Sequence, residues 1–218
     1  MDLRLYLQIA SVLFKGVGIT VSLFAITIIL SIPLGLCATF VVTGKNPVLR
    51  AITKGYVFVM RGTPLMLQLF FFYYGLKFIP GIGPYLALDR FPAACIAFVL
   101  NYAAYFCEIF RGGLLSIDPG QYEAAKVLGF GRFRTMIQII LPQMIKVALP
   151  SVANETITLV KDTALVSVIG LSDLMELSKK LVNSMVDVTP YIIAACIYLV
   201  LIFALTKLFE HLEKKATY

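Results

Sequence analysis

Five long apolar stretches constrain this chain more than any other feature, because each approaches the length needed to cross a membrane. They lie near residues 17–42, 64–79, 91–110, 147–170 and 188–208, and a hydrocarbon core about 30 Å thick needs roughly 20 apolar residues of helix. Hydrophobic residues make up 60% of the 218 residues and charged residues 14%, a balance too apolar for a soluble domain. The sequence therefore predicts an all-α membrane protein with five transmembrane helices in a single domain, residues 1–218.

Basic residues predict the orientation of these helices. If the carboxyl terminus is cytoplasmic, 12 of the 19 Lys and Arg residues fall on the cytoplasmic side, where basic residues accumulate in membrane proteins. These are Lys45, Arg50, Lys54, Arg61, Arg111, Lys126, Arg132, Arg134, Lys146, Lys207, Lys214 and Lys215. An odd number of spans then places the amino terminus outside. This orientation also accounts for the net charge of +7 without a role in nucleic-acid binding.

A helix lying in the membrane interface is predicted before the first span. Apolar and polar residues occupy separate faces there at helical spacing. Leu3, Leu7, Ala10 and Phe14 share one face, and Arg4, Gln8, Ser11 and Lys15 share another. A cleavable signal peptide is the competing interpretation, but the apolar run 17–42 is far longer than the about 7–15 residues of a signal-peptide core. We therefore expect the segment to be retained.

The connection between the third and fourth spans predicts a short helix over residues 119–128. Asp118 can cap the helix, Pro119 suits its first position, and Gln121 falls three residues after the cap, as in a capping box. Gly129 most easily takes the left-handed conformation that ends a helix. The expected helix is about 15 Å long at 1.5 Å per residue.

This short helix has the residues of a docking element. Tyr122, Ala125 and Leu128 follow helical spacing, and the small Ala124 and Ala125 allow close approach of a partner groove. Glu123 is left for a directional polar contact. An ordinary surface helix that links two spans is the alternative.

The same segment resembles the cytoplasmic signature loop of ATP-binding cassette (ABC) importer permeases. That pattern reads Glu-Ala-Ala, three residues, Gly, nine residues, Ile, any residue and Leu-Pro, and every fixed position is present from Glu123 to Pro142. The resemblance implies the five-helix architecture of type I ABC importer permeases. It also implies that the coupling loop, about residues 111–146, transmits the motion of a cytoplasmic ATPase to the membrane subunit.

Further motifs resemble the polar amino acid branch of these permeases and extend the likeness over nearly the whole chain. They are Arg61-Gly62-Thr63-Pro64, Asn101-Tyr102-Ala103-Ala104-Tyr105, Glu108-Ile109-Phe110-Arg111-Gly112-Gly113, Asp118-Pro119-Gly120-Gln121 and Lys161-Asp162-Thr163-Ala164-Leu165. In the first motif, Gly-Thr-Pro breaks or kinks a helix next to a fixed cation. Arg61, Thr63 and Pro64 are therefore candidates for a gate or a subunit contact, and the alternative is that Arg61 anchors the end of the span at the lipid headgroups.

The fourth span carries the candidate substrate pathway. Ser151, Glu155, Thr158 and Asp162 are spaced by four, three and four residues and share one helical face. Charged groups inside a bilayer usually face a cavity or a partner. The two carboxylates can bind an ammonium or a cationic side chain, while Lys161 or Asn101 can meet an α-carboxylate. The alternative is that Glu155 or Asp162 pairs with Lys161 or another helix to hold subunits together.

These observations predict the permease subunit of an ABC importer for a polar amino acid in the bacterial cytoplasmic (inner) membrane. Glu155 favours a basic substrate such as arginine, lysine or histidine, although glutamine and cystine carriers share most of the motifs. The chain has no Gly-x-x-x-x-Gly-Lys-Ser/Thr phosphate loop. ATP and magnesium are therefore expected in a partner ATPase, and the chain itself is expected to be no enzyme.

The resemblance also implies a second permease copy, identical or paralogous, and an extracytoplasmic amino acid-binding protein. No metal or other cofactor is expected on this chain, because its cysteines lie in spans without ligand spacing and its one histidine, His211, lies in a charged tail. A proton- or sodium-coupled secondary transporter that uses Glu155 and Asp162 is the alternative function. A structural membrane subunit with no pathway is a third possibility.

Overall fold

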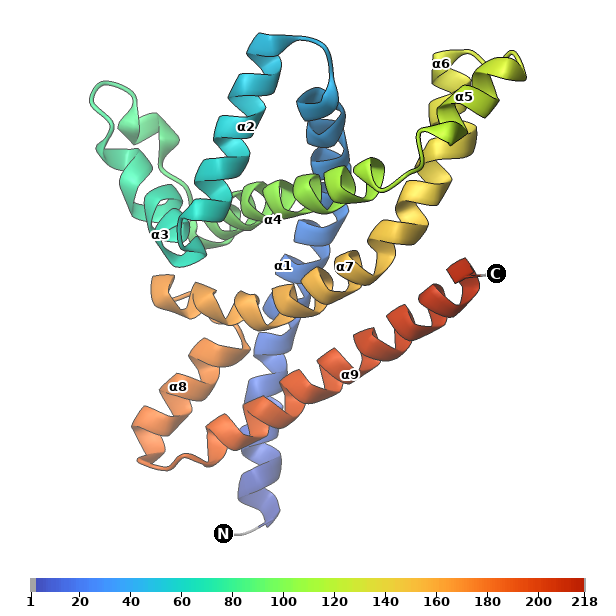
Figure 1. The fold of residues 1–218 in the computed structure, drawn as a ribbon. Helices are drawn as coiled ribbons and strands as arrows, with labels where there is room; N and C mark the ends of the chain where they lie inside the picture. The colour runs from blue at the N-terminus through green and yellow to red at the C-terminus, as the bar shows by residue number, and fades with distance from the viewer. Residues whose placement is uncertain (1–2, 218) are drawn as a thin grey trace.

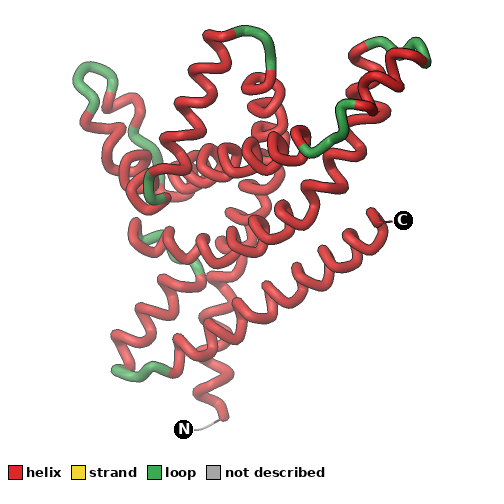
Figure 2. Tube along the Cα trace, in the orientation of Figure 1, coloured by secondary structure: helices red, strands yellow, loops and turns green. Residues whose placement is uncertain are grey.

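The computed structural model describes residues 3–217, and within them the chain is helical without a strand (Figures 1 and 2). The α-helices are α1 (Leu3–Thr43), α2 (Pro47–Gly62), α3 (Leu65–Phe70), α4 (Arg90–Leu115), α5 (Gly120–Val127), α6 (Arg132–Thr135), α7 (Leu141–Asp162), α8 (Leu174–Met185) and α9 (Thr189–Thr217). Short π-helical turns cover Phe71–Gly75 and Met136–Ile140, and 3₁₀ turns cover Leu76–Phe78, Gly83–Leu86 and Thr163–Ile169. The predicted all-α class is confirmed.

The predicted number of spans holds when one sharply bent helix pair is counted as a single span. Four runs are long and apolar enough to cross a membrane: Arg4–Thr43, Arg90–Leu115, Arg132–Ile169 and Thr189–Lys215. The fifth combines Pro47–Gly62 with Leu65–Phe78, which meet at a bend of 105°. The predicted stretch 64–79 is only the second arm of this pair.

The amino-terminal segment is helical as expected but does not form a separate interfacial helix. Residues 3–43 are one continuous helix, so the first turns extend the first span and are not a helix of their own before it. Leu7 and Phe14 are 63% and 62% exposed, whereas Ile9 and Leu13 are buried against α8 and α9. This packing keeps the first turns of α1 in line with the span.

A face of small and hydroxylated residues lets α1 pack closely along the molecule. A Cβ atom at Gly35 would lie 2.7 Å from the Cβ of Phe106, and one at Gly16 would lie 2.7 Å from the backbone of Asp173. Thr39 donates its hydroxyl to the carbonyls of Gly35 (2.9 Å) and Cys107 (3.0 Å). Small residues of this kind allow close helix–helix approach in membranes.

The bend between α2 and α3 follows from local sequence. Asn46 caps α2 by accepting from the N–H groups of Val48 and Leu49. At the other end Thr63 is extended, with φ −117° and ψ 145°, because the following Pro64 disfavours helical geometry in the residue before it. The chain therefore leaves α2 and starts α3 in a new direction.

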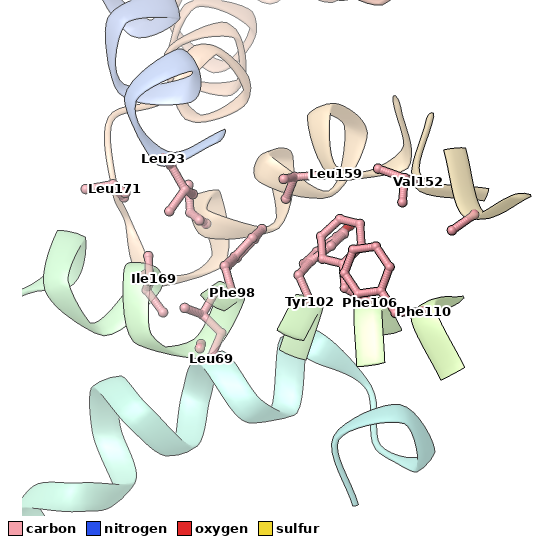
Figure 3. Close-up of a cluster of buried hydrophobic side chains, with 14 of the residues drawn as sticks. Leu23, Leu69, Phe98, Tyr102, Phe106, Phe110, Val152, Leu159, Ile169 and Leu171 are labelled. Atoms are coloured by element: carbon pink, nitrogen blue, oxygen red, sulfur yellow. The ribbon is translucent and has the colours of Figure 1, made fainter. Parts of the chain in front are cut away.

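The core is organised around an aromatic ladder on α4 (Figure 3). Phe98, Tyr102, Phe106 and Phe110 recur every four residues, and neighbouring ring centroids lie 6.2–6.4 Å apart. Leu23 of α1, Leu69 of α3 and Leu159 of α7 pack in the same cluster. The ladder holds α4 between the bent pair and α7, and so positions the site described below.

The connection from α4 to α7 is more helical than the predicted coupling loop, residues 111–146. Residues 111–115 complete α4, and 132–146 form a helical run that continues into α7. The segment 116–131 with α5, together with α6, projects beyond the long helices, on the side of the molecule where the carboxyl terminus lies (Figure 1). The fourth span therefore begins earlier than residue 147. Helix α8, capped by the buried Asp173, was not predicted.

Candidate functional site

A polar cavity of about 490 Å³ lies at the bend between α2 and α3. Side chains from three segments far apart in the sequence line it: Arg61, Gly62, Thr63, Pro64, Leu65, Asn101, Tyr102, Tyr105, Glu155, Thr158 and Asp162. This size falls in the range of small-molecule sites, which span about 300–1,000 Å³. The cavity therefore joins the Arg-Gly-Thr-Pro motif and the polar stripe of α7, which lie about 90 residues apart in the sequence.

A cluster of buried amides holds the wall of the cavity. The Nδ2 of Asn101 donates to the carbonyl of Met60 (2.9 Å) and to the Oε1 of Gln68 (3.0 Å). The Nε2 of Gln68 lies within hydrogen-bonding distance of Met60 O, Thr63 O and Thr63 Oγ1. The carbonyls freed by the bend thus find side-chain donors, as buried backbone groups require. Both Asn101 donor hydrogens are engaged in this wall, so the suggested contact between Asn101 and a substrate carboxylate is not supported.

Opposite charges face the same cavity. The Oδ2 of Asp162 accepts from the hydroxyl of Tyr102 at 2.7 Å, and Glu155 lies two turns earlier on α7. On the other wall the guanidinium of Arg61 lies 5.3 Å from the ring centroid of Tyr105, and its Nη1 lies 3.7 Å from the Oε2 of Glu108. One cation and two carboxylates can bind the two ends of a zwitterion.

Arg61 therefore does not lie where a side chain that anchors the end of a span at the lipid headgroups would lie. It is at the bend, beside the middle of α4, rather than at the end of a span. Lys161 and Ser151 are exposed and do not line the cavity. The cation that lines the cavity is thus Arg61 and not Lys161.

The alternative role for the α7 carboxylates as intrachain ion pairs is not seen. Among residues 3–217 no ion pair within 4.0 Å involves Glu155 or Asp162. Tyr102 and Tyr105 line the cavity and were not predicted as site residues. Their spacing of three residues, together with Asn101, was a signal for one polar face of α4.

The coupling segment has the predicted helix, which begins at Gly120, and the predicted helix end. Gly129 has φ +76°, and the N–H of Phe130 donates to the carbonyl of Ala125 at 2.9 Å, as in a left-handed helix end. Asp118 Oδ1 accepts from the N–H of Gly120 (2.7 Å), two residues on, as a capping side chain does. The reciprocal half of the predicted capping box is wrong, because the Oε1 of Gln121 accepts from the Nε2 of Gln143 of α7 (3.1 Å).

The exposed surface of the coupling segment lacks one of the residues predicted to face a partner, Ala125. Ala125 is only 1% exposed and packs inside the chain, so it is unavailable to a partner. Glu123 and Ala124 are exposed, and Val127 and Leu128 are 87% and 72% exposed. Exposed apolar side chains on a projecting helix are typical of a docking surface.

Comparison with known proteins identifies the class. The family model for the binding-protein-dependent transport system inner membrane component matches residues 31–218. The chain belongs to this family and is a multi-pass permease of the ABC importer class, as predicted.

Individual relatives place the chain more narrowly. It is 37% identical over 204 residues to the arginine transport system permease of Bacillus subtilis (strain 168), covering 93% of this chain and 91% of the relative. It is 35% identical over 204 residues to a putative glutamine transport system permease of Rickettsia typhi, covering 93% and 92%. A crystal structure of an amino acid ABC transporter with histidines matches with a TM-score of 0.88 at 31% identity over 99% of both chains. The predicted membership of the polar amino acid branch is confirmed.

Proposed function

We propose that this chain carries a polar amino acid through the cavity of Arg61, Glu155 and Asp162 in an ATP-driven importer. The observation that supports this most directly is the meeting of one guanidinium and two carboxylates in a single cavity. Such groups are costly inside a bilayer and are expected there only with a function. A binding-protein-dependent permease needs a site of this kind only if it holds the substrate within the membrane.

The chemistry of the cavity suits an α-amino acid. Arg61 can bind the α-carboxylate through two parallel N–H donors. Asp162, oriented by the hydroxyl of Tyr102, can bind the α-ammonium group. Glu155 then remains for a second cation, which favours a basic side chain such as that of arginine, lysine or histidine. Because the relatives include an arginine permease and a putative glutamine permease, arginine and glutamine are the two substrates whose uptake should be compared first.

Energy and delivery come from partner subunits in this proposal. The sequence has no phosphate loop, so ATP and magnesium bind in a partner ATPase whose groove receives α5 and the exposed Val127 and Leu128. A second permease copy completes the pathway, and an extracytoplasmic binding protein delivers the amino acid. The amino terminus lies outside and the carboxyl terminus in the cytoplasm, in keeping with the shared side of the carboxyl terminus and α5 (Figure 1). ATP-driven closure of the ATPase then shifts the permeases between inward-facing and outward-facing states.

The ion-coupled carrier remains the rival because it also employs Glu155 and Asp162. It gives no role to the projecting helix α5 or to the residues of the signature loop. Membership of the binding-protein-dependent family favours the ATP-driven mechanism.

Uptake by the complete transporter tests the proposal. The permease is co-purified with its ATPase and binding protein, placed in liposomes, and assayed with radiolabelled arginine, lysine, histidine and glutamine. We expect uptake to require ATP and Glu155→Gln to slow arginine uptake by about 10- to 150-fold, since a hydrogen bond to a charged group contributes about 1.5–3 kcal/mol. Glu210→Gln is the matched control, because Glu210 pairs with Lys207 on α9, away from the cavity.

Two results would contradict the proposal. Uptake driven by a proton or sodium gradient without ATP would support the ion-coupled carrier. ATP-dependent uptake that is equal in Glu155→Gln, Asp162→Asn and the control would remove the cavity from the pathway.

A further inference from the structure

Two more cavities extend the site along the space between α2 and α4. The first, about 430 Å³, shares Arg61, Gly62 and Tyr105 with the site and adds Lys54, Val57, Phe58 and Glu108. The second, about 520 Å³, shares Lys54 and Glu108 with the first and adds Val42, Thr43, Arg50, Arg111 and Leu115. Because each cavity shares lining residues with the next, the three form one groove, which we call the α2–α4 groove.

The α2–α4 groove runs from the bend to one end of the molecule. Thr43 is the last residue of α1 and Leu115 is the last residue of α4. The chain continues from Leu115 directly into the segment 116–131 with α5 (Figure 1). The groove therefore opens at the end where α4 meets the coupling segment.

Basic side chains follow the groove on one side. Arg50, Lys54 and Arg61 are spaced by four and seven residues on α2, which places them on one helical face. At 1.5 Å per residue, Lys54 lies about 10 Å from Arg61 and about 6 Å from Arg50 along the helix axis. A flexible lysine thus stands between two arginines.

In the two cavities beyond the site, Glu108 is the single carboxylate that lines the groove, and it is already neutralised. Glu108 accepts from Arg111 Nε at 3.1 Å and from Arg111 Nη2 at 2.6 Å, and it also faces Arg61 at 3.7 Å. In the part of the chain that the structure describes, Lys54 and Arg50 have no carboxylate oxygen within 4.0 Å. The groove beyond the site therefore has an excess of positive charge.

We propose that the α2–α4 groove is the release path and that Arg61, Lys54 and Arg50 pass the substrate's α-carboxylate from one to the next. This inference rests on the proposed function and adds the direction of exit and two further residues. A row of weak binding sites that carry the same charge helps a charged substrate to leave a tight binding site. Each contact that the substrate breaks is replaced by a contact with the next site. Lysine suits the middle position, since its ammonium is a mobile point charge.

Transport kinetics test the role of Lys54. Reconstituted wild-type transporter and variants are compared for the uptake of arginine and glutamine. We expect Lys54→Gln to lower the maximal rate by roughly tenfold, the effect of losing one contact worth about 1.4 kcal/mol on the way out, with KM within about twofold of wild type. Lys54→Arg should restore most of the rate. Lys45→Gln is the control, because Lys45 is a nearby exposed lysine outside the groove.

The outcomes separate this inference from the proposed function. Wild-type protein that imports neither amino acid would defeat both. Wild-type import with equal maximal rates for Lys54→Gln and Lys45→Gln would defeat the release path alone. A change in KM without a change in maximal rate would also overturn it, because Lys54 would then act in loading and not in release.

Chemical labelling tests the opening of the groove without any assumption about substrate. Lys54→Cys is made in a background with Cys37→Ser and Cys196→Ser, which removes the two exposed cysteines. We expect a membrane-impermeant thiol reagent to modify Lys54→Cys from the side of α5 and to leave Leu199→Cys, on the exposed apolar face of α9, unmodified. No reaction at Lys54→Cys, while Lys126→Cys on α5 reacts, would show that lipid or the second permease seals the groove.

Discussion

Asn101→Leu is the substitution that best separates support of the cavity wall from substrate contact. Asn101 is 4% exposed and donates both amide hydrogens, to Met60 O and to Gln68 Oε1. Leucine has nearly the same shape and cannot donate. Met60 O keeps its bond from Gln68, but Gln68 Oε1 loses its donor in a buried position. The 105° bend that forms the site then loses one of its two supporting amides.

The expected loss can be worked from these contacts. A lost hydrogen bond contributes about 1 kcal/mol, and a buried acceptor left without a partner costs about 1–3 kcal/mol, so Asn101→Leu should destabilise the fold by about 2–4 kcal/mol. For a chain of this size that corresponds to a melting temperature lower by roughly 4–16 °C. The assay is thermal unfolding of the purified transporter in detergent, followed by size-exclusion chromatography of the heated samples.

Asn154→Leu is the matched control, because Asn154 is exposed on α7. We expect the control to melt within about 1 °C of wild type, since surface substitutions usually change stability by less than 0.5 kcal/mol. A melting temperature for Asn101→Leu equal to that of Asn154→Leu would show that Asn101 does not support the bend. A normal melting temperature together with lost amino acid uptake would mean that Asn101 binds substrate directly.

Three further outcomes are expected. Gly129→Val should reduce ATPase-coupled uptake with normal membrane insertion, because φ +76° strains a β-branched residue. Gly129→Asn should retain more uptake, because asparagine tolerates this conformation. Equal uptake by the two variants would contradict the predicted helix end. Gly16→Val should lower the yield of folded protein far more than Gly18→Val, since a Cβ at Gly16 would lie 2.7 Å from backbone while Gly18 is open. Burial raises the pKa of the Asp173 carboxyl from 3.8 to about 6, so the folded protein keeps this proton between about pH 4 and 6 when the unfolded chain loses it. Its contribution to stability should therefore fall by about 3 kcal/mol as the pH rises through that window, and Asp173→Asn should flatten the dependence in unfolding measurements.

The sequence predicts the features that depend on long apolar runs and on local backbone rules. The four continuous spans follow from hydropathy, and the helix end at Gly129 follows from glycine's access to positive φ. The stripe of Glu155, Thr158 and Asp162 follows from helical spacing, and the structure places all three on the cavity. These inferences need no knowledge of what packs against each helix.

The features in which the structure differs from the sequence predictions depend on tertiary contacts. Ala125 looks available in the sequence, but the coupling segment folds over it. The first turns of α1 look like a separate helix, but α8 and α9 bury Ile9 and Leu13. Lys161 looks like the cation nearest to Asp162, yet the bend at Thr63 brings Arg61 into the cavity. In each case a neighbour from a distant part of the chain decides which face is covered.

Cryo-electron microscopy of the complete transporter with bound amino acid would locate the substrate site. We expect substrate density in the 490 Å³ cavity, with the carboxylate at Arg61 and an ammonium group at Asp162 or Glu155. Substrate density elsewhere, with this cavity filled by side chains or lipid, would exclude the cavity as the substrate site.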